Sequence, residues 1–171
     1  MNNTDILKQA NVIIASQELN PDHAYLYGIN VKDDSIDLVE ISHYWESYAM
    51  LGDPENKVKI QQYQYALILT NGWAISYTAD EEDDNLTRLA PSEHPDRLRV
   101  SLRALYSPDS GFATSVYIEN NPEPMYDTQG NGMLADAIMA LFDNDKVLLN
   151  KTSVDTLNAF VVDDEDADLF Q

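Results

Sequence analysis

Apolar and polar residues alternate with a period of two along much of this chain, and this pattern most constrains its fold. The clearest run covers residues 97–106, where apolar side chains point to one side and three arginines to the other. Further alternating runs cover residues 25–31, 36–42, 63–70, 73–78 and 112–119. Each run predicts a β-strand that exposes different chemistry on its two faces. We therefore expect a sheet of about six strands.

Short turn sequences join several of these runs. Lys32-Asp33-Asp34-Ser35 separates the first two, and Ser107 to Gly111 separates the run at 97–106 from the run at 112–119. Asn71-Gly72 lies between the runs at 63–70 and 73–78. Because Asn-Gly accepts the positive φ angles of a type I′ turn, it predicts a tight β-hairpin there. Neighbouring strands joined in this way are antiparallel.

Helical spacing of apolar residues occurs in three places. Thr4 is a candidate N-cap for a helix that reaches Leu19, and Tyr44, Tyr48 and Leu51 indicate a short helix ended by residues 52–54. Residues 134–142 form a third apolar stripe. We expect an α+β fold with a mostly antiparallel sheet and helices near the N-terminus, in the middle and near the C-terminus, covering one face. Residues 1–160 should form one domain, followed by an acidic, flexible tail at 161–171.

Charge restricts the partners of the protein. Asp and Glu number 30 against 10 Lys and Arg, which gives a formal charge of −20. Two runs hold five acids each: Asp80, Glu81, Glu82, Asp83 and Asp84, and then Asp163, Asp164, Glu165, Asp166 and Asp168. Such a charge repels nucleic acid and anionic membranes and attracts basic surfaces. We expect a basic protein surface as the partner, with neither direct nucleic-acid binding nor membrane binding.

Motifs that carry catalytic or metal chemistry are weak in this sequence. The chain has no cysteine, and neither acidic run has the glycine and glutamate of a calcium loop. Residues 130–135 match a dinucleotide-binding fingerprint, but no βαβ unit surrounds them, so a loop leading into a helix is the favoured interpretation. His43 and Glu46 supply only two possible metal ligands, and a metal centre needs more. We expect no catalytic residue, no cofactor and no metal.

The sequence shows no pattern typical of a signal peptide or a membrane helix. The first residues lack a basic segment followed by an apolar core, and no apolar run approaches the roughly 20 residues of a membrane helix. The expectation is a cytoplasmic location.

Three of the four arginines lie on one side of a single strand. Period two places Arg97, Arg99 and Arg103 together, where they could clamp an anionic ligand. Because acids are abundant, the favoured interpretation is that they pair with carboxylates of the same chain, with the run at 80–84 as the nearest candidate.

The C-terminal segment combines five acids with Leu169 and Phe170. In form it resembles the acidic, aromatic-ended tails with which bacterial and phage single-stranded-DNA-binding proteins recruit partners, although Gln171 follows the aromatic residue here. The resemblance implies a peptide that docks in a basic pocket. A solubilising, disordered end is the alternative, and both remain open.

A second resemblance covers about residues 72–141. Gly72-Trp73-Ala74, residues 92–100 and Leu134-Ala135-Asp136-Ala137 are similar to segments of small uncharacterised proteins of actinobacteria and their phages. The resemblance implies that these segments form one folded unit of bacterial or phage origin, and it implies no activity.

We therefore expect a non-enzymatic acidic protein of phage or bacterial origin that binds a basic surface of another protein. Three alternatives stay open. The first is a DNA mimic that inhibits a nucleic-acid-binding enzyme. The second is an enzyme or small anionic-ligand binder that uses Arg97, Arg99 and Arg103 with the Gly130–Gly132 loop and His94. The third is a virion or assembly component. The oligomeric state is left open as well.

Overall fold

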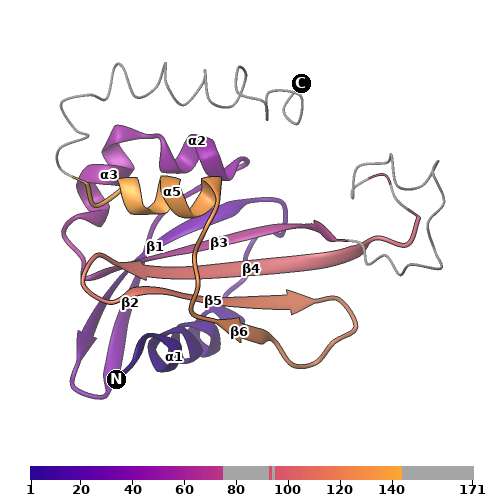
Figure 1. Ribbon diagram of the computed structural model, residues 1–171, viewed down its shortest axis with the longest axis horizontal. Coiled ribbons are helices and arrows are strands. Elements are labelled where there is room, and N and C mark those ends of the chain that lie inside the picture. Colours follow the sequence, from indigo (N-terminus) through magenta and orange to yellow (C-terminus); the bar gives the residue numbers. More distant parts are fainter. Residues whose placement is uncertain (75–92, 94, 144–171) are drawn as a thin grey trace.

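The computed structural model describes residues 1–74, 93 and 95–143, and it places them in one antiparallel sheet flanked by helices (Figure 1). Its order in space is β2-β1-β3-β4-β5-β6. The strands are β1 (Ala24–Lys32), β2 (Ser35–Tyr44), β3 (Tyr65–Ala74), β4 (Leu98–Ser107), β5 (Gly111–Ile118) and β6 (Met125–Asp127). The helices are α1 (Asn3–Ala15), α2 (Ser47–Leu51), α3 (Pro54–Ile60) and α5 (Met133–Ala140). The predicted α+β class, with six mostly antiparallel strands, is confirmed.

The first hairpin follows the sequence pattern closely. β1 and β2 pair from Ala24–Tyr44 to Lys32–Ser35, with one irregularity beside Leu26 and Tyr27. Asp33 takes a positive φ of 54° at the turn, a conformation that Asp tolerates better than most residues. The turn predicted at residues 32–35 is therefore confirmed.

Asn71-Gly72 is not a turn, and that prediction was wrong. β3 continues through both residues, with Asn71 opposite Ser101 and Gly72 opposite Val100 of β4. The side-chain amide of Asn71 donates a hydrogen bond to the carbonyl oxygen of Pro21, 2.8 Å away. Pairing along β4 and this tie to Pro21, both remote in sequence, override the local turn preference. The sixth strand is instead β6, a three-residue edge strand beside β5.

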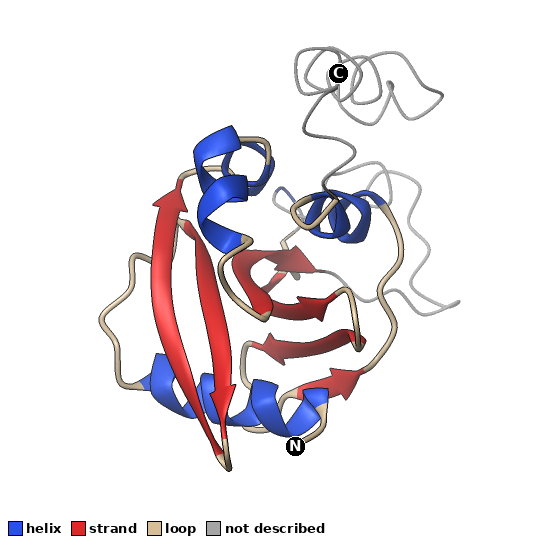
Figure 2. Cartoon of the chain, turned by 90° about the vertical axis from the view of Figure 1, so that its left-hand side faces the viewer, coloured by secondary structure: helices blue, strands red, loops and turns tan. Residues whose placement is uncertain are grey.

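Helices cover both faces of the sheet, so the expectation that they cover one face was also wrong. α1 lies on one face and α2, α3 and α5 lie on the other (Figures 1 and 2). The reason is in the central strands, where residues 24–29 of β1 and 66–69 of β3 are buried without alternation. A strand that is apolar on both sides needs cover on both sides.

Each face has its own apolar core. Beneath α1, residues such as Ile6, Leu7 and Ile14 pack in one cluster with Tyr27, Leu67 and Leu105. On the opposite face, Met50, Ile60 and Ile138 cluster with Leu26, Ile68 and Ala104. Successive residues of β1 and β3 therefore contribute to different cores.

Helix boundaries differ from the expected ones at both ends of α1 and at the start of α2. Tyr44, expected in the middle helix, is the last residue of β2, and α2 begins at Ser47. Asn2, not Thr4, caps α1, with its side-chain oxygen accepting from the backbone N–H of Asp5. α1 ends at Ala15, because the Ser16 hydroxyl donates to the carbonyl oxygen of Ile13 and closes the last turn. None of the helices in the described ranges is both long and apolar enough to span a bilayer.

α3 was not expected from the sequence. Gly52 ends α2 as expected, but a second helix starts at once at Pro54, with Asp53 as its N-cap. Proline suits the first position of a helix, because its missing N–H would have no partner there.

Candidate functional site

The arginines of β4 lie on the face that α1 partly covers. Arg99, Ser101 and Arg103 alternate along the strand, which confirms the predicted period, and Arg97 immediately precedes it. On β3, Trp73 lies opposite Arg99 and Asn71 opposite Ser101. On β5, Tyr117 lies opposite Ser101 and Ser115 opposite Arg103. We call the set Trp73, Arg97, Arg99, Ser101, Arg103 and Tyr117 the arginine face.

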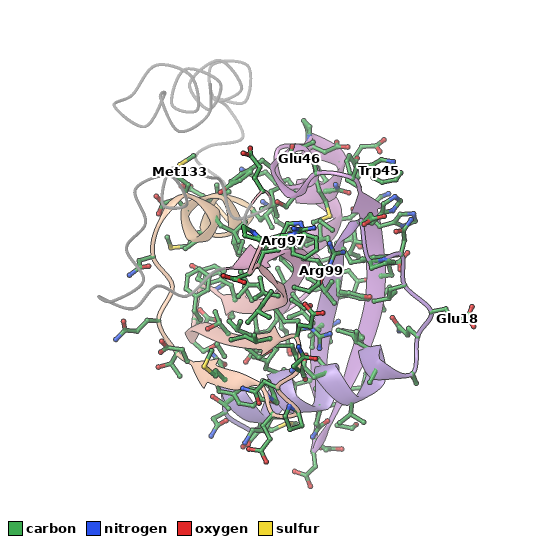
Figure 3. The ribbon with its side chains drawn as sticks, turned by 90° about the vertical axis from the view of Figure 1, so that its right-hand side faces the viewer. Glu18, Trp45, Glu46, Arg97, Arg99 and Met133 are labelled. Carbon is green, nitrogen blue, oxygen red and sulfur yellow. The ribbon has the colours of Figure 1, made fainter. Side chains whose placement is uncertain are left out.

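Two of the arginines stack on one tryptophan. The guanidinium carbons of Arg97 and Arg99 lie 4.6 and 4.8 Å from the ring centroid of Trp73, within the range of cation–π attraction. Figure 3 shows Arg97 and Arg99 close together at this end of the molecule. Arg99 also donates from Nη2 to the carbonyl oxygen of Pro21 at 3.2 Å and lies 3.5 Å from Oδ1 of Asp22. Arg99 therefore pairs with a carboxylate of its own chain, while the expected partner at 80–84 lies outside the described residues.

Arg103 has neutral partners. Its Nη1 donates to Oδ1 of Asn11 at 3.0 Å, its Nε donates to Oγ of Ser101 at 3.3 Å, and its guanidinium carbon lies 4.1 Å from the ring centroid of Tyr117. Within the described residues Arg103 forms no ion pair. Burial lowers the pKa of its guanidinium, because a low-dielectric setting disfavours the charged form.

Buried side chains fix the partners of Arg103. Asn11 is 5% exposed, and its Nδ2 donates to Oγ of fully buried Ser115 at 3.1 Å. That bond orients the amide so that its oxygen faces Arg103. Burial also raises the pKa of the Tyr117 hydroxyl, while the charge of Arg103 acts to lower it. The Arg103 charge is therefore surrounded by amide, hydroxyl and aromatic groups.

Three aromatic side chains meet at the end of the first hairpin. The His23 ring stacks on His43 with centroids 5.2 Å apart and meets the edge of Trp45 at 4.4 Å. Trp45 is 73% exposed, and Figure 3 shows it and Glu46 above the arginines. Within the described chain, neither ring nitrogen of His23 has a hydrogen-bond partner.

The considered metal pair of His43 and Glu46 is not brought together as a site. Both carboxylate oxygens of Glu46 cap α2 by accepting from the backbone N–H groups of Tyr48 and Ala49. His43 instead lies 3.5 Å from Glu40, measured from Nδ1 to Oε2. Among the described residues, no three His, Asp or Glu side chains gather as metal ligands.

The glycines at 130 and 132 have structural roles. A Cβ on Gly130 would come within 2.4 Å of the Phe112 ring, so the backbone packs directly on that ring. Gly132 has a φ of 93° at the start of α5, a conformation that favours glycine. The segment leads into a helix and follows an antiparallel edge strand, so it lacks the parallel unit that binds dinucleotides.

The acidic runs at 80–84 and 163–168, His94, Leu169 and Phe170 lie outside the described residues. The described part holds 18 acidic and 7 basic residues, a formal charge of −11. Sixteen of those 18 acids are exposed. The surplus of carboxylates is therefore a property of the folded surface and not only of the two runs.

Sequence reasoning found the arginines but missed the residues that hold them. Asn11, Trp73 and Tyr117 reach the site from α1, β3 and β5, so only the strand order brings them together. Alternation within 112–119 already placed Ser115 and Tyr117 on one face, which was the one available signal. No protein-family model, curated protein or solved structure matches the chain.

Proposed function

We propose that the protein is a non-enzymatic interaction protein that binds a basic surface of another protein. The observation that carries this proposal is the exposed surplus of carboxylates: 16 exposed acids in the described part against 7 basic residues of any exposure. Even complete pairing would leave most of these carboxylates without a cation. Unpaired surface carboxylates add little to stability, so a role in recognition accounts for them better.

A strongly negative surface increases the rate of association with a basic partner and makes binding selective. A strongly negative protein attracts a basic partner and accelerates encounter, and it rejects acidic partners. At physiological ionic strength the attraction acts over about 8 Å. A specific complex therefore also needs apolar anchors, because charge alone would bind any basic protein.

The C-terminal segment combines both elements. Its five acids would steer it to a basic site, and Leu169 and Phe170 would bury apolar surface there. The run at 80–84 has the same number of acids but no aromatic residue within five positions after it. We therefore assign the specific contact to the tail.

The two runs provide a matched experiment. One variant carries Asn or Gln at the five acids of 163–168, and a control carries them at the five acids of 80–84, so both lose the same charge. A third variant, Leu169→Ala with Phe170→Ala, keeps every charge. Tagged proteins are used to capture partners from bacterial lysate at low and physiological salt, and captured proteins are identified by mass spectrometry.

The expected result is one partner retained by the wild type and by the 80–84 control, and lost by both tail variants. Equal loss in the two charge variants, or no partner even at low salt, would contradict the proposal. Displacement of the partner by duplex DNA at matched salt would favour the DNA-mimic alternative instead.

A further inference from the structure

Arg103 is a partly buried cation held by neutral groups in a chain with three acids for every base. Taking a charge out of water is costly unless an opposite charge compensates. Here the described partners are the Asn11 oxygen, the Ser101 hydroxyl and the Tyr117 ring. These partners solvate the guanidinium but leave its positive charge uncompensated.

Arg103 contacts the row of residues that includes Ser101, and Arg99 shares a hydrogen-bond partner with that row. Arg103 bonds Ser101 and covers Tyr117, which is the β5 neighbour of Ser101. Arg99 bonds the Pro21 carbonyl oxygen, which also accepts from Asn71, the β3 neighbour of Ser101. Nη2 of Arg99 also lies 3.5 Å from Oδ1 of Asp22, an exposed carboxylate that a bound oxyanion would displace. Arg99 and Arg103 therefore flank the row Asn71–Ser101–Tyr117 on its two sides.

We infer that this row, between Arg99 and Arg103, binds an oxyanion, namely the phosphate or carboxylate group of a small ligand. Guanidinium groups bind such anions through two parallel hydrogen bonds. The Ser101 and Tyr117 hydroxyls add donors, and the rings of Trp73 and Tyr117 offer flat surfaces beside the anion. This site goes beyond the proposed function, because partner binding uses the negative surface and this site attracts negative ligands.

A purely structural role for Arg103 is the competing explanation, and Asn11→Asp separates the two. The carboxylate would take the place of the amide beside Arg103, and the Ser115 hydroxyl would donate to it instead of accepting. The variant supplies the missing counter-charge with almost no change of shape. If Arg103 is only structural, Asn11→Asp should leave the affinity for added anions unchanged. If Arg103 binds an anion, the new carboxylate already pairs with it, and Asn11→Asp should weaken the binding of an added anion.

The probes are inorganic phosphate and benzoate, added to the full chain at physiological salt. Trp45→Phe leaves Trp73 as the sole tryptophan, so its fluorescence reports on the arginine face, and calorimetry gives the affinity independently. We expect at least one probe to bind with a Kd of about 1 mM or tighter. Whichever binds identifies the source of the oxyanion.

Arg103→Gln and Asn11→Asp should each weaken binding at least roughly tenfold, which is the loss of one charge-assisted contact. Lys32→Gln is the control: it removes the same charge from an exposed pair with Asp37 at the first turn and should change the affinity less than about twofold. Asn11→Asp should keep the wild-type midpoint of urea unfolding or raise it, so it tests the site even if Arg103→Gln does not fold. Binding of neither probe at about 20 mM, or wild-type binding by Asn11→Asp, would overturn the inference.

Discussion

Gly28→Ala tests the packing of the Tyr63 ring on β1. Gly28 lies in the middle of β1, between Val39 of β2 and Ala66 of β3. A Cβ at this position would lie 2.5 Å from two atoms of the Tyr63 ring, so the ring must move. Overpacking of this kind costs about 1–3 kcal/mol. Removing glycine from a strand returns about 0.5–1 kcal/mol, so we expect a net loss of about 1–2 kcal/mol.

The same substitution should change sign when the ring is removed. In a Tyr63→Ala background the three nearest atoms that oppose the new methyl group are gone, and Gly28→Ala should be neutral or stabilising by up to about 1 kcal/mol. Urea unfolding followed by tryptophan fluorescence gives the four free energies of this double-mutant cycle. The reasoning fails if Gly28→Ala stabilises the wild type, or if its effect is the same with and without the Tyr63 ring.

Three further predictions concern backbone conformation and titration. Gly72→Thr should be tolerated or stabilise by several tenths of a kcal/mol, because the position is extended and open, whereas Gly132→Ala should cost about 1–2 kcal/mol at its φ of 93°; equal thermal melts would contradict this contrast. Asp53→Ala should cost about 1 kcal/mol at neutral pH as a lost helix cap. Hydrogen bonds from Tyr44 and the backbone N–H of Glu55 lower the pKa of Asp53. The contribution of its charge to the free energy of unfolding is therefore complete above about pH 4 and is lost as the pH falls through the folded pKa. A difference in urea unfolding between wild type and Asp53→Ala that does not change with pH would refute this. Burial, with Glu40 nearby, raises the pKa of Tyr27 above its usual range. The free energy of unfolding should therefore fall as the pH rises above about 10, and it should fall less steeply in Tyr27→Phe. The same slope against pH in wild type and Tyr27→Phe would argue against this.

Sequence patterns correctly predicted those structural features that depend only on residues close together in the sequence. The alternation of β4, the turn at Asp33 and the end of α2 at Gly52 all follow from residues within one turn or strand. The two wrong expectations about the sheet, its turn at Asn71-Gly72 and its covered face, depended on distant residues. Asn71 extends a strand because Pro21 and Ser101 hold it, and the helices divide between two faces because β1 and β3 are buried on both.

The arginine face shows the same division. The sequence of one strand predicted that Arg97, Arg99 and Arg103 lie together. The partners of these arginines, such as Asn11, Trp73 and Tyr117, come from α1, β3 and β5, so the sequence of that strand could not predict them. The missed helix α3 has a local cause, because Asp53 followed by Pro54 is already a favourable helix start. Pro54 ends one helix and begins the next, and the expectation included only the first of these two roles.

The position of α1 has a consequence for how the chain folds as it is synthesised. Asn3 donates to the carbonyl oxygens of Ser110 and Gly111, and Asn11 donates to Ser115. α1 therefore completes its core only after a strand about a hundred residues later has left the ribosome. At about 5–20 residues per second, its apolar stripe waits roughly 5–20 s for that partner. During this interval Ile6, Leu7 and Ile14 can pack only against the part of their core that β1, β2 and β3 supply. Synthesis, not chain diffusion, therefore sets the time at which the core is completed.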